Sequence, residues 1–62
     1  MPLIELKAFE RRFEDPEAAE RVIAKLTDAL CEALGEEVRE ETWVVLEGVE
    51  PARWGFAGKV RT

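Results

Sequence analysis

Apolar and charged residues alternate at the start of the chain, and this pattern predicts a strand over residues 3–9. Apolar side chains fall on one face of it and charged side chains on the other: Ile4, Leu6 and Ala8 against Glu5 and Lys7. The next five residues, 10–14, are mostly charged and are expected to form a connection.

The apolar positions then change to a spacing of three and four, which predicts a helix that begins at Pro16 and ends before Gly35. Asp15 is suited to cap the helix, and proline is favoured at the first helical position. Glycine is favoured just after the last turn, so Gly35 is the expected stop. The apolar stripe consists of Ala19, Val22, Ile23, Leu26, Leu30, Ala33 and Leu34.

An acidic connection over residues 36–41 leads to a second predicted strand. Residues 43–46 read Trp-Val-Val-Leu, and β-branched and aromatic residues favour strands. Three residues are expected to end this strand: Gly48, Glu50 and Pro51. The tail over residues 54–60 carries two glycines among apolar residues, which predicts a bend and a short hairpin.

Strand, helix and strand in this order predict an α/β fold: a βαβ unit with parallel strands and a right-handed crossover, then a short C-terminal β-hairpin. The 62 residues, 1–62, form one domain, and a domain of this size buries only roughly 60% of its unfolded surface. A single cysteine, Cys31, excludes an internal disulfide, and without histidine a zinc site is not expected. Dimers that extend the sheet, and then a higher assembly, are expected to cover the remaining apolar surface.

Net charge narrows the classes of partner. The chain carries a formal charge of −5, whereas binding to nucleic acid or to an anionic membrane requires a clustered excess of Lys and Arg. No apolar run approaches the roughly 20 residues of a membrane-spanning helix, and no secretory signal is recognised. A cytoplasmic location is therefore expected.

The absence of histidine also narrows the chemistry, because histidine is the side chain best suited to proton transfer near neutral pH. Among the remaining groups, the α-amino group starts closest to neutrality, with a pKa of about 7.7–8.0. Removal of Met1 would expose Pro2 as a secondary amine, and apolar surroundings would lower its pKa further. Alternatively, Pro2 only begins an edge strand, where its missing N–H is harmless.

Three features occur together in this chain: Pro2 directly after the initiator methionine, Arg12 just before the helix, and the segment Trp-Gly-Phe-Ala-Gly at 54–58. Over almost its whole length the chain resembles the 4-oxalocrotonate tautomerase family. The resemblance implies a cofactor-free isomerase of aromatic degradation. Such an enzyme moves a proton between enol and keto forms of an unsaturated 2-oxo acid such as 2-hydroxymuconate. It also implies a homohexamer built as a trimer of dimers.

The resemblance assigns roles to individual residues. Pro2 would act as general base and then acid, Arg12 would hold a substrate carboxylate, and Trp54 would wall the pocket. Trp43 stands where the family usually has a second, substrate-binding arginine. Three residues could supply the missing charge, as could a different partner subunit: Arg39, Arg53 or Arg61.

Two alternatives remain open at this stage. Hydration or dehalogenation of a 3-haloacrylate would use a protonated Pro2 as acid, together with a carboxylate that activates water. A non-catalytic subunit of a hetero-oligomer would explain Trp43 at the arginine position, and retention of Met1 would favour it, because the Pro2 nitrogen would then be an amide. Cys31 is expected to be a structural thiol in either case, since no histidine is available to activate it.

Overall fold

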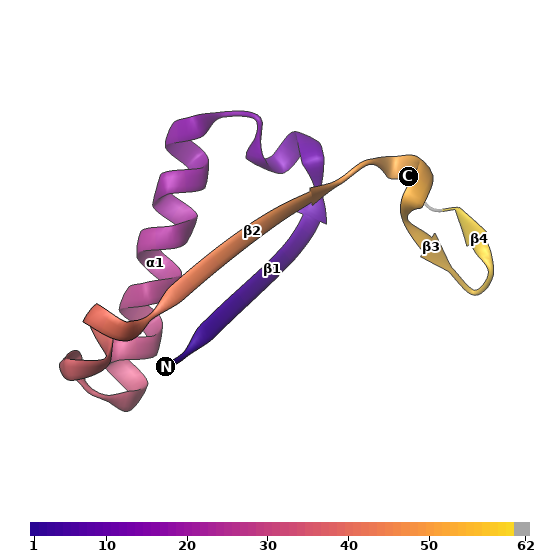
Figure 1. Ribbon diagram of the computed structural model, residues 1–62. Helices are drawn as coiled ribbons and strands as arrows, with labels where there is room; N and C mark the ends of the chain where they lie inside the picture. The colour runs from indigo at the N-terminus through magenta and orange to yellow at the C-terminus, as the bar shows by residue number, and fades with distance from the viewer. Residues whose placement is uncertain (61–62) are drawn as a thin grey trace.

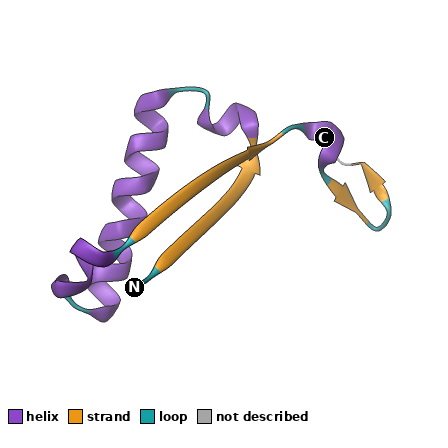
Figure 2. Ribbon diagram, in the orientation of Figure 1, coloured by secondary structure: helices purple, strands orange, loops and turns teal. Residues whose placement is uncertain are grey.

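The computed structural model of the chain describes residues 1–60 and confirms the predicted βαβ unit with a C-terminal hairpin (Figures 1 and 2). The strands and the α-helix are β1 (Leu3–Phe9), α1 (Pro16–Leu34), β2 (Trp43–Val49), β3 (Gly55–Phe56) and β4 (Lys59–Val60). Short 3-10 helices connect them: η1 (Glu10–Phe13), η2 (Glu36–Glu41) and η3 (Pro51–Arg53). Arg61, one candidate for the missing charge, lies outside the described residues.

Strands β1 and β2 pair in parallel, from Leu3 opposite Trp43 to Phe9 opposite Val49. The more covered side chains of each strand alternate with exposed ones, because one face of the sheet carries α1 and the other is left open by the rest of residues 1–60 (Figure 1). The sheet therefore has a covered face and an open face.

Of the three residues expected to end the second strand, Glu50 and Pro51 do follow its last residue, but Gly48 does not break it, because β2 continues through Gly48 to Val49. A Cβ at Gly48 would lie 2.8 Å from the Cα of Glu10, the first residue of η1. Glycine is thus needed for the close approach of η1 to the strand, and it interrupts neither the backbone nor the pairing.

Both predicted ends of the helix are confirmed. The Asp15 carboxylate accepts a hydrogen bond from the Glu17 N–H at 3.0 Å, and Pro16 is the first helical residue. At the other end, the Gly35 N–H donates to the Cys31 carbonyl at 2.7 Å, with Gly35 at a φ of 112° that favours glycine. Local sequence alone therefore sets the length of α1.

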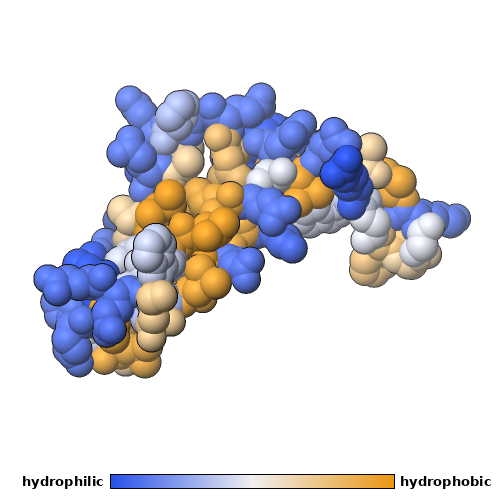
Figure 3. All heavy atoms as spheres, in the orientation of Figure 1, coloured by the Kyte–Doolittle hydropathy of each residue, from blue (hydrophilic) through white to orange (hydrophobic). Residues whose placement is uncertain are grey.

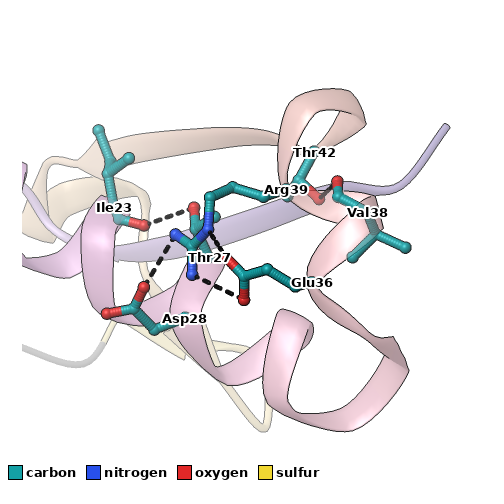
Figure 4. Close-up of polar contacts among 7 residues, drawn as sticks. All are labelled: Ile23, Thr27, Asp28, Glu36, Val38, Arg39 and Thr42. Atoms are coloured by element: carbon teal, nitrogen blue, oxygen red, sulfur yellow. Dashed lines mark hydrogen bonds and ion pairs between the residues drawn. The ribbon is translucent and has the colours of Figure 1, made fainter.

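The two charged segments expected to connect the strands and the helix form 3-10 helices over most of their length. Within η2, Arg39 contacts Glu36 three residues earlier, a spacing that brings side chains together in a 3-10 helix (Figure 4). The Thr42 hydroxyl donates to the Val38 carbonyl at 2.7 Å and closes the last turn before β2. These contacts fix the point at which β2 begins.

The C-terminal hairpin projects away from the βαβ unit (Figure 1). Strands β3 and β4 are antiparallel, with Phe56 opposite Lys59 across a two-residue turn. Both turn residues have positive φ, 54° at Ala57 and 83° at Gly58, as a type I′ turn requires. Glycine tolerates this conformation, but alanine does not favour it.

Very little of the chain is shielded from solvent. Cys31 is the one buried side chain among the described residues, at 4% exposure. The radius of gyration is 14.1 Å, compared with about 10.6 Å for a compact domain of this length. Apolar residues gather over the middle of the strands in Figure 3, with hydrophilic residues at the ends of the βαβ unit. The large exposed apolar residues are Met1, Leu3, Ile23, Leu34, Trp43, Val45, Phe56 and Val60.

Within residues 1–60, no helix combines the length and the apolar character that crossing a membrane would require.

Candidate active site

Pro2 lies at the amino end of the sheet, directly before β1. Its carbonyl accepts a hydrogen bond from the Trp43 N–H at 3.0 Å, which fixes Pro2 against the first residue of β2. Pro2 itself is half-buried. The predicted base is therefore held by the backbone of Trp43, the residue at which the resemblance led us to expect a second arginine.

The open face of the sheet is apolar beside Pro2. Leu3 and Trp43 are opposite each other in the strand register, and Val45 follows two residues later on the same face. Their side chains are 58%, 60% and 48% exposed, respectively. A ligand that reached Pro2 from this side would meet hydrocarbon and an indole ring.

Arg12 lies in η1, beyond the carboxyl end of β1. It is exposed, and none of the described carboxylates forms an ion pair with it. The neighbouring Arg11 is engaged differently, because its guanidinium carbon lies 4.9 Å from the centroid of the Phe9 ring. Of these two arginines, Arg12 is the one without a contact to another side chain among the described residues.

Trp54 is at the same end as Arg12. Its ring lies 4.7 Å from the Phe9 ring, centroid to centroid, at an interplanar angle of 43°. This tilted contact anchors Trp54 to the last residue of β1, so Phe9 holds both Arg11 and Trp54 beside η1.

Gly48 is a residue that the sequence analysis did not connect to the site. Because a Cβ there would collide with Glu10, the position of η1, and with it that of Arg12, depends on this glycine. An isolated glycine inside an apolar strand pattern often marks such a close backbone approach, and that signal was present in the sequence.

The two groups of site residues lie at opposite ends of the sheet. β1 separates Pro2 from η1, and seven extended residues span about 23 Å. One chain therefore does not bring Pro2 and Arg12 together. Pro2 and Trp43 are adjacent at the amino end, whereas Arg12 and Trp54 are at the carboxyl end.

The two other candidate arginines that the structure describes are already paired. Arg39 contacts Glu36 and lies 2.9 Å from the Asp28 carboxylate on α1 (Figure 4). Its hydrogen bonds, to Glu36 first and then to Asp28, raise the pKa of Arg39 above its ordinary value and hold it in the charged form. Arg53 lies 3.4 Å from the Glu50 carboxylate, in an exposed pair. Each of these charges is balanced within the chain.

A hollow of about 270 Å³ lies near the carboxyl end of β2. Its floor includes Gly48, and three carboxylates and one arginine contribute to its rim. The lining residues are Glu10, Glu47, Gly48, Val49, Glu50 and Arg53. Over residues 1–60, no group of three or more His, Cys, Asp or Glu side chains is arranged to hold a metal ion.

Comparison with known proteins gives one family. Residues 2–62 match the family model described as "Tautomerase enzyme", which takes in Pro2 and everything after it. Neither the curated proteins nor the solved structures yield a match.

Proposed function

This chain belongs to the tautomerase family, and we propose that it is a cofactor-free isomerase whose base is the amino nitrogen of Pro2. The reaction moves a proton between the enol and keto forms of an unsaturated 2-oxo acid. The observation that carries this proposal is the position of Pro2, held at the amino end of the sheet by the Trp43 N–H and flanked by apolar side chains.

Removal of Met1 gives Pro2 a free secondary amine. Apolar neighbours disfavour the charged form of an amine, so its lone pair is available near neutral pH. The amine takes the proton from the enol hydroxyl, the carbonyl forms, and the electron pair moves along the conjugated chain to a distant carbon. That carbon then takes the proton back from the Pro2 ammonium, which restores the base.

Arg12 binds the substrate carboxylate in this proposal. An unpaired guanidinium holds a carboxylate through two parallel hydrogen bonds and keeps its charge at every working pH. Fixed positive charge at that end also stabilises the electron density that accumulates as the proton leaves. Trp54, anchored on Phe9, closes this side of the pocket and excludes water.

Assembly is part of the proposal, because Pro2 and Arg12 lie about 23 Å apart along β1 and must come from different chains. The exposed surface supports it: the described chain exposes 5051 Å², against about 4,100 Å² for a compact monomer of this mass. The excess resembles the roughly 800 Å² that each partner buries in a standard interface. Dimers that join into a homohexamer of three dimers would complete the sites.

The test follows the ketonisation of 2-hydroxymuconate and phenylenolpyruvate in the ultraviolet. The wild type, with its intact mass confirming loss of Met1, is compared with Pro2→Ala. We expect Pro2→Ala to lose roughly 100-fold or more in kcat/KM, the usual contribution of a positioned base. For the wild type, kcat/KM should rise with pH through the pKa of the amine, because only the neutral form accepts a proton.

Equal rates for Pro2→Ala and the wild type would contradict the mechanism. A pH profile that falls where the amine loses its proton would show that Pro2 acts as an acid, as hydration of a 3-haloacrylate requires.

A further inference from the structure

We propose that the apolar surface beside Pro2 selects enols with a single carboxylate and a flat apolar tail, and that Trp43 and Leu3 bind the tail. This inference rests on the proposed function and names the substrate class of the same site. It concerns the two strand-end residues nearest Pro2 and the charges available around them.

The surface next to Pro2 is suited to an apolar ring. Trp43 is bound through its N–H to the Pro2 carbonyl, and its side chain is 60% exposed. Leu3 lies directly opposite in the register and is 58% exposed, so the two side chains stand together on the open face of the sheet. An indole offers a flat face on which an aryl group can stack in an offset arrangement.

The arginines without a partner outside α1 suffice to bind one substrate carboxylate. Four described arginines lie outside α1, and three of them are engaged in the chain, Arg39 and Arg53 with carboxylates and Arg11 with the Phe9 ring. Arg12 is the fourth, and it has no such partner among residues 1–60. A substrate held at Arg12 by one end would find no second guanidinium without a partner among the described arginines outside α1.

Negative charge on the open face further disfavours a substrate with a second carboxylate. Glu5 follows Leu3 on this face and lies opposite Val45 in the register. None of the described cations forms an ion pair with Glu5. Lys7, the next residue on this face, lies 3.9 Å from Glu47 instead. A second carboxylate beside Trp43 would be desolvated against apolar groups and repelled by Glu5, whereas an aryl tail meets neither cost.

The test compares two substrates on the same enzyme. Phenylenolpyruvate has one carboxylate and a phenyl tail, and 2-hydroxymuconate has two carboxylates. We expect the wild type to favour phenylenolpyruvate by roughly tenfold or more in kcat/KM. Trp43→Arg should shift the ratio toward 2-hydroxymuconate by roughly 100-fold, because it removes the ring and adds the missing charge.

Matched variants separate the tail subsite from other effects. Trp43→Phe keeps an aromatic ring and should keep the preference for phenylenolpyruvate. Ala29→Arg adds the same charge on the exposed surface of α1 and should leave the ratio unchanged. Size-exclusion chromatography of each variant shows whether Trp43 instead packs between chains, in which case its substitution changes the assembly.

A wild type that turns over the dicarboxylate as well as or better than phenylenolpyruvate overturns the inference, and so does an unchanged ratio in Trp43→Arg. Neither result touches the proposed function as long as Pro2→Ala abolishes turnover of both substrates. If Pro2→Ala is as active as the wild type, the proposed function itself fails.

Discussion

The two ends of the β1–β2 sheet differ in chemistry. At the amino end, Pro2 and the first residues of both strands form an apolar surface with no free cation among the described residues. At the carboxyl end, η1 carries two arginines beside an aromatic pair. An amine base works best where charge is disfavoured, and a carboxylate binds best where positive charge is fixed. The fold keeps these requirements apart within a chain, so under the proposed function each end would depend on the opposite end of another chain.

The strongest test of this division mixes two impaired proteins. In Pro2→Ala the amino end is defective, and in Arg12→Ala the carboxyl end is defective. Unfolding and refolding them together should restore activity from the background of either variant to roughly a quarter of the wild-type value. In a random assembly, about a quarter of the sites combine an intact Pro2 from one chain with an intact Arg12 from another. Separately refolded samples, mixed afterwards, are the control. A mixture no more active than its components would place both ends of the site in one chain.

Arg12 should matter more than its neighbour in sequence. Arg12→Ala removes a charge-assisted hydrogen-bond pair worth about 1.5–3 kcal/mol, so kcat/KM should fall roughly 10- to 100-fold. Arg11→Ala is the matched variant, and its smaller effect should reflect only the lost contact with Phe9. Steady-state kinetics on one substrate measures both. An equal loss in the two variants would contradict the assignment of the carboxylate to Arg12.

Gly48 tests whether η1 is positioned by the close approach at β2. In Gly48→Ala the new Cβ would lie 2.8 Å from the Cα of Glu10, so η1 must move. Such overpacking costs about 1–3 kcal/mol of stability, and the displaced η1 should raise KM for the carboxylate substrate. Gly55→Ala is the control, because its nearest contact would be an ordinary 3.5 Å. If Gly48→Ala unfolds at the wild-type temperature with an unchanged KM, the approach does not position Arg12.

The smallest effect is expected in the hairpin, away from both ends of the sheet. Ala57 occupies a positive φ that asparagine tolerates better, and Asn-Gly is the favoured pair for a type I′ turn. Ala57→Asn should therefore stabilise the hairpin by about 0.5–1 kcal/mol. This gain is smaller than the roughly 1–2 kcal/mol that the left-handed conformation costs an alanine. Thermal unfolding measures the gain, and Ala52→Asn in η3 is the control. A lower unfolding temperature for Ala57→Asn would show that another interaction determines this turn.

The sequence predicts the elements well where the determining contacts are local. Asp15, Pro16 and Gly35 act within one or two turns of the helix, and each does in the structure what its residue type favours. The predicted extent of β2 fell short because the reason for Gly48 lies in Glu10, 38 positions earlier in the chain. Contacts between distant segments leave only weak traces in a single sequence.

The candidate site was less predictable than the fold. Residue types and spacing single out Pro2 and Arg12, but they do not reveal that β1 holds the two apart. Glu36 is close enough in sequence to Arg39 to suggest pairing, whereas Asp28 reaches it only through the packing of η2 on α1. The accessibility of a charge thus depends on tertiary packing, which periodicity does not encode.

The thinness of the chain affects how a defective copy would behave in a cell. Its shortest dimension is 15 Å, and Cys31 is the one described side chain fully sheltered, so an isolated copy has little to keep it folded. In the proposed assembly, folding and association become one concentration-dependent event, so dilution should lower both the melting temperature and the specific activity. A copy that is catalytically inactive but still associates would join assemblies with wild-type copies. The sites that it shares with them would then be inactive. Mutations at either end of the sheet would consequently act dominantly, whereas mutations that prevent folding would be recessive.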